Sequence, residues 1–158
     1  MEIDKLNFLT GVWKGKGVAQ YPTIQTVDYT EELVFKKQDI LNVLFYEQKT
    51  WVKNEAGIFN KPIFWESGFL IDKGKYIELC NVQLSGRMEV LIGELINSAD
   101  NKFEINFLNK NIFNDERMIR SRRRVAFSET EINYEVMMST KENLNFNIHL
   151  KAVLNKEL

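Results

Sequence analysis

The sequence has little cysteine, histidine or proline: its 158 residues include one Cys, one His and two Pro. Because Cys80 stands alone, no disulfide can form within the chain, and a reducing cytoplasm is the expected location. One histidine, His149, and one cysteine exclude a Cys/His zinc cluster, and no Ser-His-Asp set is possible without His149. An active site in this chain therefore uses His149 or manages without histidine.

The sequence also lacks an excess of charge of one sign. It has 21 Lys and Arg and 22 Asp and Glu, for a formal net charge of −1. This balance gives no overall attraction to nucleic acid or to an anionic membrane surface. No run approaches the roughly 18 apolar residues of a membrane span. The segment 1–13 lacks the basic and apolar regions of a signal peptide. We therefore expect neither a nucleic-acid partner nor a membrane partner.

Short segments with strand-forming residues fill most of the chain, and turn signals such as 72–74 and 85–86 separate them. The predicted strands cover residues 12–19, 26–36, 43–53, 63–72, 75–83, 87–97, 102–109, 118–127, 131–139 and 146–154. Ten strands joined by tight turns predict an all-β antiparallel meander that closes into an up-and-down barrel, because closure removes exposed sheet edges. No linker or repeat divides the chain, so residues 1–158 are expected to form a single domain.

One short helical turn is predicted before the first strand. Ile3, Leu6 and Leu9 recur at helical spacing, and Asp4 is available as a cap. We therefore expect a short helix or a single turn that ends before Gly11. It is the only helix that the sequence supports.

The first predicted strand carries an unusual number of small residues on one face. At period two, Gly11, Trp13, Gly15 and Gly17 share that face. Glycine inside a strand costs stability, so the pattern predicts a sharp bend or the close approach of another body. A barrel corner that packs on its own backbone and a ligand site are both open interpretations. The spacing does not match a phosphate-binding loop.

The same segment carries a family resemblance. Gly-x-Trp-x-Gly-x-Gly at residues 11–17 is similar to a signature of the nitrobindin family, and Tyr-Pro-Thr-Ile at 21–24 follows at the family's spacing. The similarity continues in order through further family landmarks at residues 66–69, 86–90, 134–138 and 149–152. The chain therefore resembles the nitrobindins over nearly its whole length.

This resemblance implies a ten-stranded barrel related in shape to fatty-acid-binding proteins and lipocalins, with ferric heme b at one end. The family's proximal iron ligand lies in a terminal His-Leu-x-Ala motif and corresponds to His149. Thr23 and Ile24 correspond to the distal side, and Arg123 to a basic position near the heme. Family members bind nitric oxide, and several isomerise peroxynitrite to nitrate. Whether this chain is such an enzyme stays open.

The chain departs from the family pattern at two positions. Phe64 stands where the family often has a histidine, so any distal or rim role of that histidine is absent. Ala19 replaces a family glycine, a small change that the same strand should tolerate. Heme binding is expected to survive these changes, with a different rate, oxygen sensitivity or ligand preference.

The local pattern around His149 disagrees with the resemblance. Alternation in a strand places His149 on the face of Asn147 and Lys151, opposite Ile148 and Leu150. From these residues alone, a solvent-exposed histidine is the favoured interpretation. A neutral imidazole is nevertheless a common axial ligand of heme iron, and the resemblance makes His149 the expected ligand.

Four arginines, at positions 120, 122, 123 and 124, form the one charge cluster. A charged barrel strand is the favoured interpretation. An inward arginine would suit a carboxylate, either a heme propionate or the head group of a fatty acid. The second hypothesis is therefore a heme-free carrier of a small hydrophobic ligand, such as a fatty acid. The expected partner is a small molecule (nitric oxide, peroxynitrite or an apolar acid), and pairing into a homodimer stays open.

Overall fold

One short helix and eleven strands form the described part of the chain. The computed structural model describes residues 2–20, 25–39 and 41–158. The elements are the 3-10 helix η1 (Glu2–Leu9) and the strands β1 (Gly11–Ala19), β2 (Val27–Lys37), β3 (Val43–Lys53), β4 (Phe59–Asp72), β5 (Ile77–Gln83), β6 (Met88–Gly93), β7 (Leu95–Ala99), β8 (Lys102–Phe113), β9 (Met118–Phe127), β10 (Glu131–Thr140) and β11 (Asn147–Lys156).

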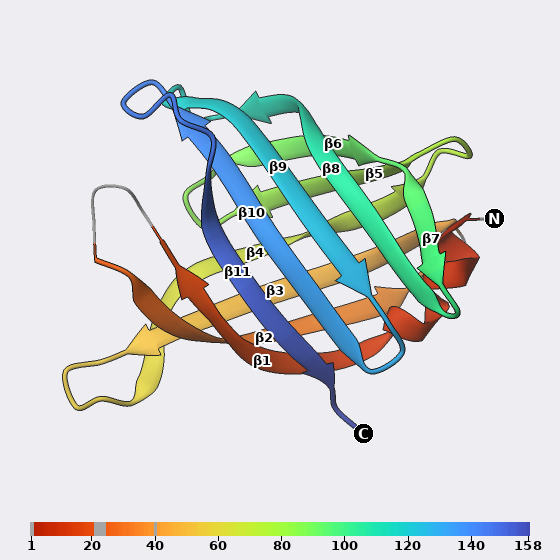
Figure 1. Ribbon diagram of the computed structural model, residues 1–158, viewed down its shortest axis with the longest axis horizontal. Helices are drawn as coiled ribbons and strands as arrows, with labels where there is room; N and C mark the ends of the chain where they lie inside the picture. Colours follow the sequence, from red (N-terminus) through yellow and green to blue (C-terminus); the bar gives the residue numbers. More distant parts are fainter. Residues whose placement is uncertain (1, 21–24, 40) are drawn as a thin grey trace.

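The strands belong to one antiparallel sheet that closes into a barrel (Figure 1). Most strands pair with their neighbours in the chain, and β1 also pairs with β11, so the first and last strands lie side by side. The pairing of β6 with β8 closes the other side of the sheet. The predicted antiparallel up-and-down barrel is therefore confirmed.

The ten predicted strands are recovered, with one of them divided. The predicted strand at 87–97 corresponds to β6 and β7, which only Glu94 separates. β6 pairs with β5 and β8, whereas β7 continues along β8 alone, so the two segments act as one bent strand of a ten-stranded barrel. β4 starts at Phe59, earlier than predicted, because the sheet continues across Pro62 through a register shift against β3.

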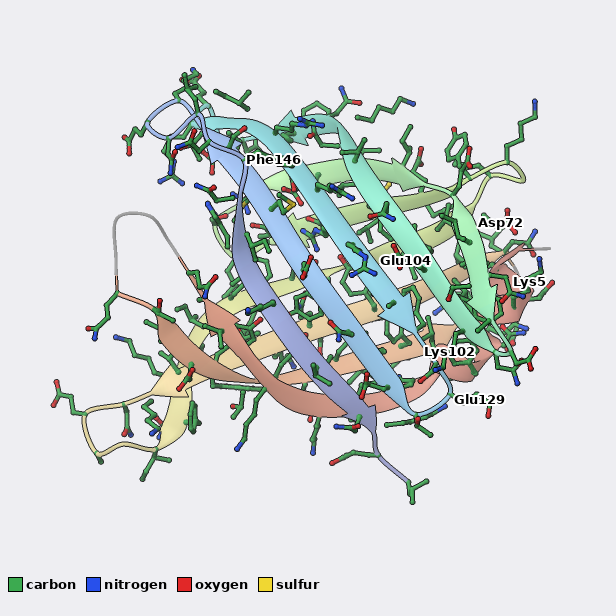
Figure 2. The ribbon with its side chains drawn as sticks, in the orientation of Figure 1. Lys5, Asp72, Lys102, Glu104, Glu129 and Phe146 are labelled. Atoms are coloured by element: carbon green, nitrogen blue, oxygen red, sulfur yellow. The ribbon has the colours of Figure 1, made fainter. Side chains whose placement is uncertain are left out.

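The helix η1 lies at one end of the barrel, at the right of Figure 1. Its residues Ile3, Leu6 and Leu9 are buried, because a helix with about three residues per turn places this spacing on one face. The Ile3 amide donates to the Asp72 carboxylate at 3.1 Å, which ties η1 to the end of β4; Figure 2 labels Asp72 there. The predicted helical turn is confirmed. Within the described residues, no helix is long and apolar enough to span a bilayer.

Apolar side chains fill the barrel next to η1. Trp13 of β1 is fully buried, and its indole N–H donates to the Leu9 carbonyl at 2.7 Å. Burying each large apolar side chain stabilises the fold by roughly 1.5–3 kcal/mol. Other fully buried side chains on the surrounding strands are Leu44, Ile77, Ile105, Ile132 and Leu154.

The glycines of β1 allow close approach inside the barrel. A Cβ at Gly15 would lie 2.0 Å from the Val153 carbonyl oxygen of β11, and a Cβ at Gly17 would lie 2.3 Å from the Tyr29 ring. Neither position can hold a side chain without displacing its neighbour. Gly11 begins the strand with a φ of 125°, which favours glycine. The close approach that the sequence predicted therefore involves the chain's own backbone and Tyr29.

Candidate functional site

His149 lies in a β-bulge of the last strand. Val136 of β10 pairs with Leu150, but the next residue, Met137, pairs with Ile148, so His149 is an extra residue in β11. One inserted residue shifts the side-chain alternation by one position. His149 is consequently buried, with 6% of its surface exposed. The exposed histidine favoured by strict alternation is therefore wrong, because the bulge breaks that alternation.

The surroundings of His149 favour the uncharged imidazole. Burial lowers the pKa of His149, and the guanidinium of Arg87 lowers it further. Arg87 comes from the turn between β5 and β6, on another wall of the barrel, and its Nη2 donates to the Met138 sulfur at 3.7 Å. Met138 is itself buried on β10. This end of the interior therefore presents a neutral imidazole, the form that ligates metals.

A buried ion-pair cluster crosses the middle of the barrel. Arg123 of β9 donates through both terminal nitrogens to the Glu66 carboxylate of β4, with Nη2 and Oε2 3.0 Å apart. The same Nη2 donates to Glu89 of β6 at 2.6 Å. The Tyr46 hydroxyl donates to Glu66 at 2.7 Å, and Arg87 Nε lies 3.7 Å from Glu89 Oε1. The cluster therefore joins side chains from four different strands and one turn.

Opposite charges keep Arg123 and Glu89 ionised. Burial would lower the pKa of Arg123, but Glu66 and Glu89 raise it well above its usual value. Burial would raise the pKa of Glu89, but Arg123 and Arg87 hold it below its usual value. Of the four arginines at 120–124, Arg123 is thus the one that points into the barrel. The carboxylates that it contacts are those of Glu66 and Glu89, not those of a ligand. Its expected role near a heme stays a prediction.

A second polar cluster surrounds Glu31, which is almost fully buried on β2. Gln48 Nε2 donates to Glu31 Oε1 at 2.8 Å and to the Tyr134 hydroxyl at 3.1 Å. The Tyr134 hydroxyl donates to the other Glu31 oxygen and lies 2.8 Å from the Tyr29 hydroxyl. Burial raises the pKa of Glu31 to about 8, although the bonds from Tyr134 and Gln48 act to lower it. The Glu31 carboxyl is therefore mostly protonated at neutral pH.

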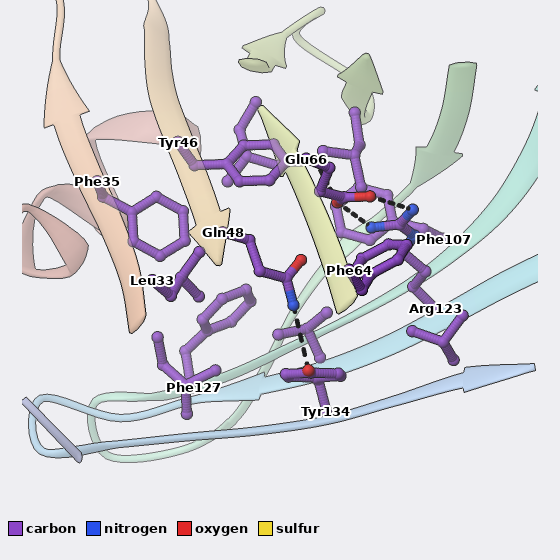
Figure 3. A pocket seen from close by; sticks show the side chains of 15 residues that line it. Leu33, Phe35, Tyr46, Gln48, Phe64, Glu66, Phe107, Arg123, Phe127 and Tyr134 are labelled. Carbon is purple, nitrogen blue, oxygen red and sulfur yellow. Dashed lines mark hydrogen bonds and ion pairs between the residues drawn. The ribbon is translucent and has the colours of Figure 1, made fainter. Parts of the chain in front are cut away.

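Between the two polar clusters lies a cavity of about 70 Å³ (Figure 3). Polar side chains in its wall are Tyr46, Gln48, Glu66, Arg123 and Tyr134. The apolar wall residues are Leu33, Phe35, Phe64, Leu70, Leu79, Phe107, Val125, Phe127, Ile132 and Val136. Phe64, which replaces a family histidine, therefore contributes an aromatic ring to the interior.

The structure does not bring all predicted site residues together. Thr23 and Ile24 lie outside the described residues. His149 lies in the β11 bulge and Arg123 belongs to the ion-pair cluster. Val136 of β10 pairs with Arg123 on one side and with Leu150, the neighbour of His149, on the other. Trp13 packs at the η1 end, among the apolar residues there.

The other arginines of the charge cluster belong to the barrel surface. Arg120 lies over the Phe146 ring, with the guanidinium carbon 4.5 Å from the ring centroid; Figure 2 labels Phe146. Arg124 pairs with Glu104 at 2.8 Å, and Arg122 donates to an asparagine of β8. A charged barrel strand, the favoured interpretation, thus describes three of the four arginines.

Sequence reasoning missed the polar interior. Glu31 is not among the expected site residues, and Glu66 and Glu89 enter only as parts of the family landmarks at 66–69 and 86–90. A usable signal was the alternation that places Glu31 on the same face as Tyr29 and Leu33. That parity predicts a carboxyl group inside the barrel, which is uncommon enough to mark a special position.

Comparisons with known proteins agree with this architecture. A family model described as THAP4-like, heme-binding β-barrel domain matches residues 2–156. The crystal structure of Rv2717c from M. tuberculosis superposes with a TM-score of 0.86 at 26% sequence identity, covering 99% of this chain and 97% of that chain. The likeness therefore extends over the whole barrel.

Curated relatives show similar sequences. Peroxynitrite isomerase Rv2717c of Arabidopsis thaliana is 33% identical over 152 residues, which cover 96% of this chain and 86% of that protein. The ferric nitrobindin-like protein of Streptomyces griseus is 33% identical over 65% of this chain and 53% of its own length. Peroxynitrite isomerase 2 of Mycobacterium ulcerans is 36% identical over 58% of this chain and 55% of its own length. The latter two matches thus span about half of those relatives.

Proposed function

This chain belongs to the family of THAP4-like heme-binding β-barrel domains, and we propose that it binds ferric heme b through His149. We further propose that the heme iron binds nitric oxide and isomerises peroxynitrite to nitrate. The observation that carries the proposal is the buried imidazole of His149, held neutral in the β11 bulge. The names of the Arabidopsis and Mycobacterium relatives support the isomerase activity.

The residues around His149 fit a heme. His149 would hold the heme iron, because a neutral imidazole ligates iron through a ring nitrogen and the pKa of His149 is lowered by burial. Ala19 of β1 pairs with Leu150, next to His149, and both are buried. Buried Met138 adds a further apolar side chain at this end of the barrel. An apolar lining with one neutral imidazole is the setting that a heme requires.

When bound, ferric heme would supply a Lewis-acidic iron that can bind nitric oxide or peroxynitrite. His149 would hold and orient the heme, and the apolar side chains would exclude water. Phe64 offers an aromatic ring instead of the proton donor that a histidine would provide at this position. Thr23 and Ile24 are proposed for the distal side and Arg123 for a basic position near the heme.

The heme-free carrier of a fatty acid receives less support. Arg123, the inward arginine, already contacts two carboxylates of the chain. A cytoplasmic location, suggested by the lone Cys80, and pairing into a homodimer belong to the same proposal.

Hemin titration of the purified apoprotein, followed by absorbance, tests the proposal. We expect a saturable one-to-one Soret shift for the wild type that His149→Ala abolishes. Added imidazole should restore the band in His149→Ala, because a free imidazole can occupy the space of the lost side chain. The matched control is Lys151→Ala, an exposed change two residues further along β11, which should titrate like the wild type.

An equal Soret shift in wild type and His149→Ala would contradict the assignment of the iron ligand. No shift in either protein would contradict heme binding altogether and would favour the carrier. With heme loaded, the decay of added peroxynitrite and the ratio of nitrate to nitrite formed then test the isomerase activity.

A further inference from the structure

The interior cavity borders the proposed heme site and suggests a second binding site for a small molecule. Two of its wall residues, Phe64 and Arg123, are also the ones expected near the heme. Its wall comes from seven strands, β2 to β5 and β8 to β10, so it lies within the barrel (Figure 3). Val136 marks its position along the barrel, because this wall residue pairs with Leu150, directly beside the bulge of His149. The cavity therefore lies next to the strand segment that carries the expected iron ligand.

We propose that this cavity binds a small, uncharged and nearly apolar molecule of the size class of a diatomic gas. The proposal concerns the heme-free interior and does not depend on heme binding. Nitric oxide and dioxygen belong to this chemical class. If the chain also binds heme, such a cavity would hold a gaseous ligand close to the iron without iron coordination.

Size and lining favour this class. A volume of about 70 Å³ exceeds what a single buried water needs, which is on the order of 10–15 Å³. Ten of the fifteen wall residues are apolar. A buried water requires two to four polar partners, and apolar cavities stay dry and accept small apolar molecules instead. The cavity therefore offers space that water fills poorly.

The polar wall groups are mostly engaged with each other. Gln48 donates to Glu31 and to Tyr134, and Tyr46 donates to Glu66. Among the described residues, the one polar wall atom that is buried without a hydrogen-bond partner is Nε of Arg123. One donor can contact a weakly accepting atom of a small molecule, but it cannot hold a network of waters.

Charge excludes an anion from the same space. Arg123 contacts two carboxylates, those of Glu66 and Glu89, so it has no uncompensated positive charge to offer. A further carboxylate or a peroxynitrite anion would meet two like charges in a buried setting, which is strongly unfavourable. A neutral molecule avoids that repulsion.

Xenon and dioxygen are the probes for the experiment, which uses the full heme-free chain. Methyl carbon–proton correlation spectra are recorded with rising xenon pressure. We expect saturable shifts confined to the methyl groups of Leu33, Leu79, Ile132 and Val136. Paramagnetic dioxygen should enhance relaxation of the same methyl groups more strongly than that of other buried methyl groups, such as those of Leu6.

Two valine variants provide the matched comparison. Val136→Phe places a phenyl ring in the cavity and should abolish the xenon shifts. Val153→Phe makes the same change on the exposed outer face of β11 and should preserve them. Leu33→Phe serves as the second cavity-filling variant if Val136→Phe fails to fold.

Shifts that are scattered over surface methyl groups, or that persist in the cavity-filling variants, would overturn the proposal. So would contacts between the cavity methyl groups and slowly exchanging water in the absence of any xenon effect. These outcomes are separable from the hemin titration, because a chain that fails to bind heme through His149 can still take up xenon in this cavity.

Discussion

The η1 end and the middle of the barrel differ in how their interiors are built. At the η1 end, apolar side chains such as Leu6, Leu9 and Trp13 are fully buried. In the middle, Glu31, Glu66 and other ionisable groups occupy the same inward-facing positions of the strands. The η1 end therefore stabilises the fold, whereas the middle buries polar groups whose removal from water costs free energy.

The polar middle of the barrel adds little to the stability of the fold. A buried ion pair is poor support for stability, because desolvation can exceed the attraction between the charges. The polar middle is tolerated because its charges are paired and because the apolar end offsets the cost. The expected iron ligand and the cavity lie on the polar side of this division.

Removing the cation from the polar middle should have the largest effect. Arg123→Met leaves Glu66 and Glu89 buried without a counter-charge on Arg123, and we expect a loss of about 3–5 kcal/mol in unfolding free energy. Urea unfolding followed by tryptophan fluorescence measures it. Adding Glu66→Gln and Glu89→Gln to the same chain should recover much of the loss.

The control for this change is Arg124→Met, because Arg124 pairs with Glu104 on the exposed surface. We expect an effect of about 0–1 kcal/mol there, which is typical of surface ion pairs. Equal losses for the two arginine variants would contradict the distinction between a buried, paired cluster and a charged outer face.

A cavity at the apolar end should have the next largest effect. Leu6→Ala removes a fully buried side chain of η1, and we expect a loss of about 2–4 kcal/mol in unfolding free energy. Because Leu6 lies at the far end from the bulge of His149, hemin affinity of the folded variant should be unchanged. Thr10→Ala, an exposed change in the same region, serves as the control. A parallel loss of hemin affinity would contradict the separation of the two regions.

The barrel was predictable from sequence because its signals are local. Each signal can be read from a few consecutive residues: the alternation of the strands, the turn residues and the three-residue spacing of Ile3, Leu6 and Leu9. The division of the strand at Glu94 and the early start of β4 at Phe59 depend on pairing partners instead. Those boundaries were therefore missed.

The site was less predictable, because a bulge and long-range partners determine it. No local pattern marks the extra residue at His149; only the pairing of Val136 and Met137 with β11 reveals it. The family resemblance pointed to His149 in spite of the alternation. Nothing in the sequence spacing joined Glu66, Glu89 and Arg123, which come from three distant strands.

The third prediction concerns the pH dependence of the polar middle, where the expected change per pH unit is smaller than either loss of unfolding free energy above. Burial raises the pKa of Glu31 from an ordinary 4.5 to about 8 in the folded chain. Between these values the unfolded chain has released the proton while the folded chain retains it, so the folded state binds more protons. Stability must then fall as pH rises through this window, by roughly 1 kcal/mol per pH unit, and level off above the folded pKa.

Glu31→Gln removes this titration and keeps an acceptor for Tyr134 and Gln48, the two side chains that donate to Glu31. Urea unfolding at a series of pH values should therefore give a shallower decline for Glu31→Gln than for the wild type. The matched control is Glu32→Gln, the neighbouring carboxylate on the outer face, which pairs with Lys14 at 3.6 Å and should keep the wild-type slope. If both variants decline like the wild type, Glu31 does not hold its proton in the folded barrel. The middle of the barrel would then bury the charge of Glu31 with hydrogen bonds from Tyr134 and Gln48 to stabilise it.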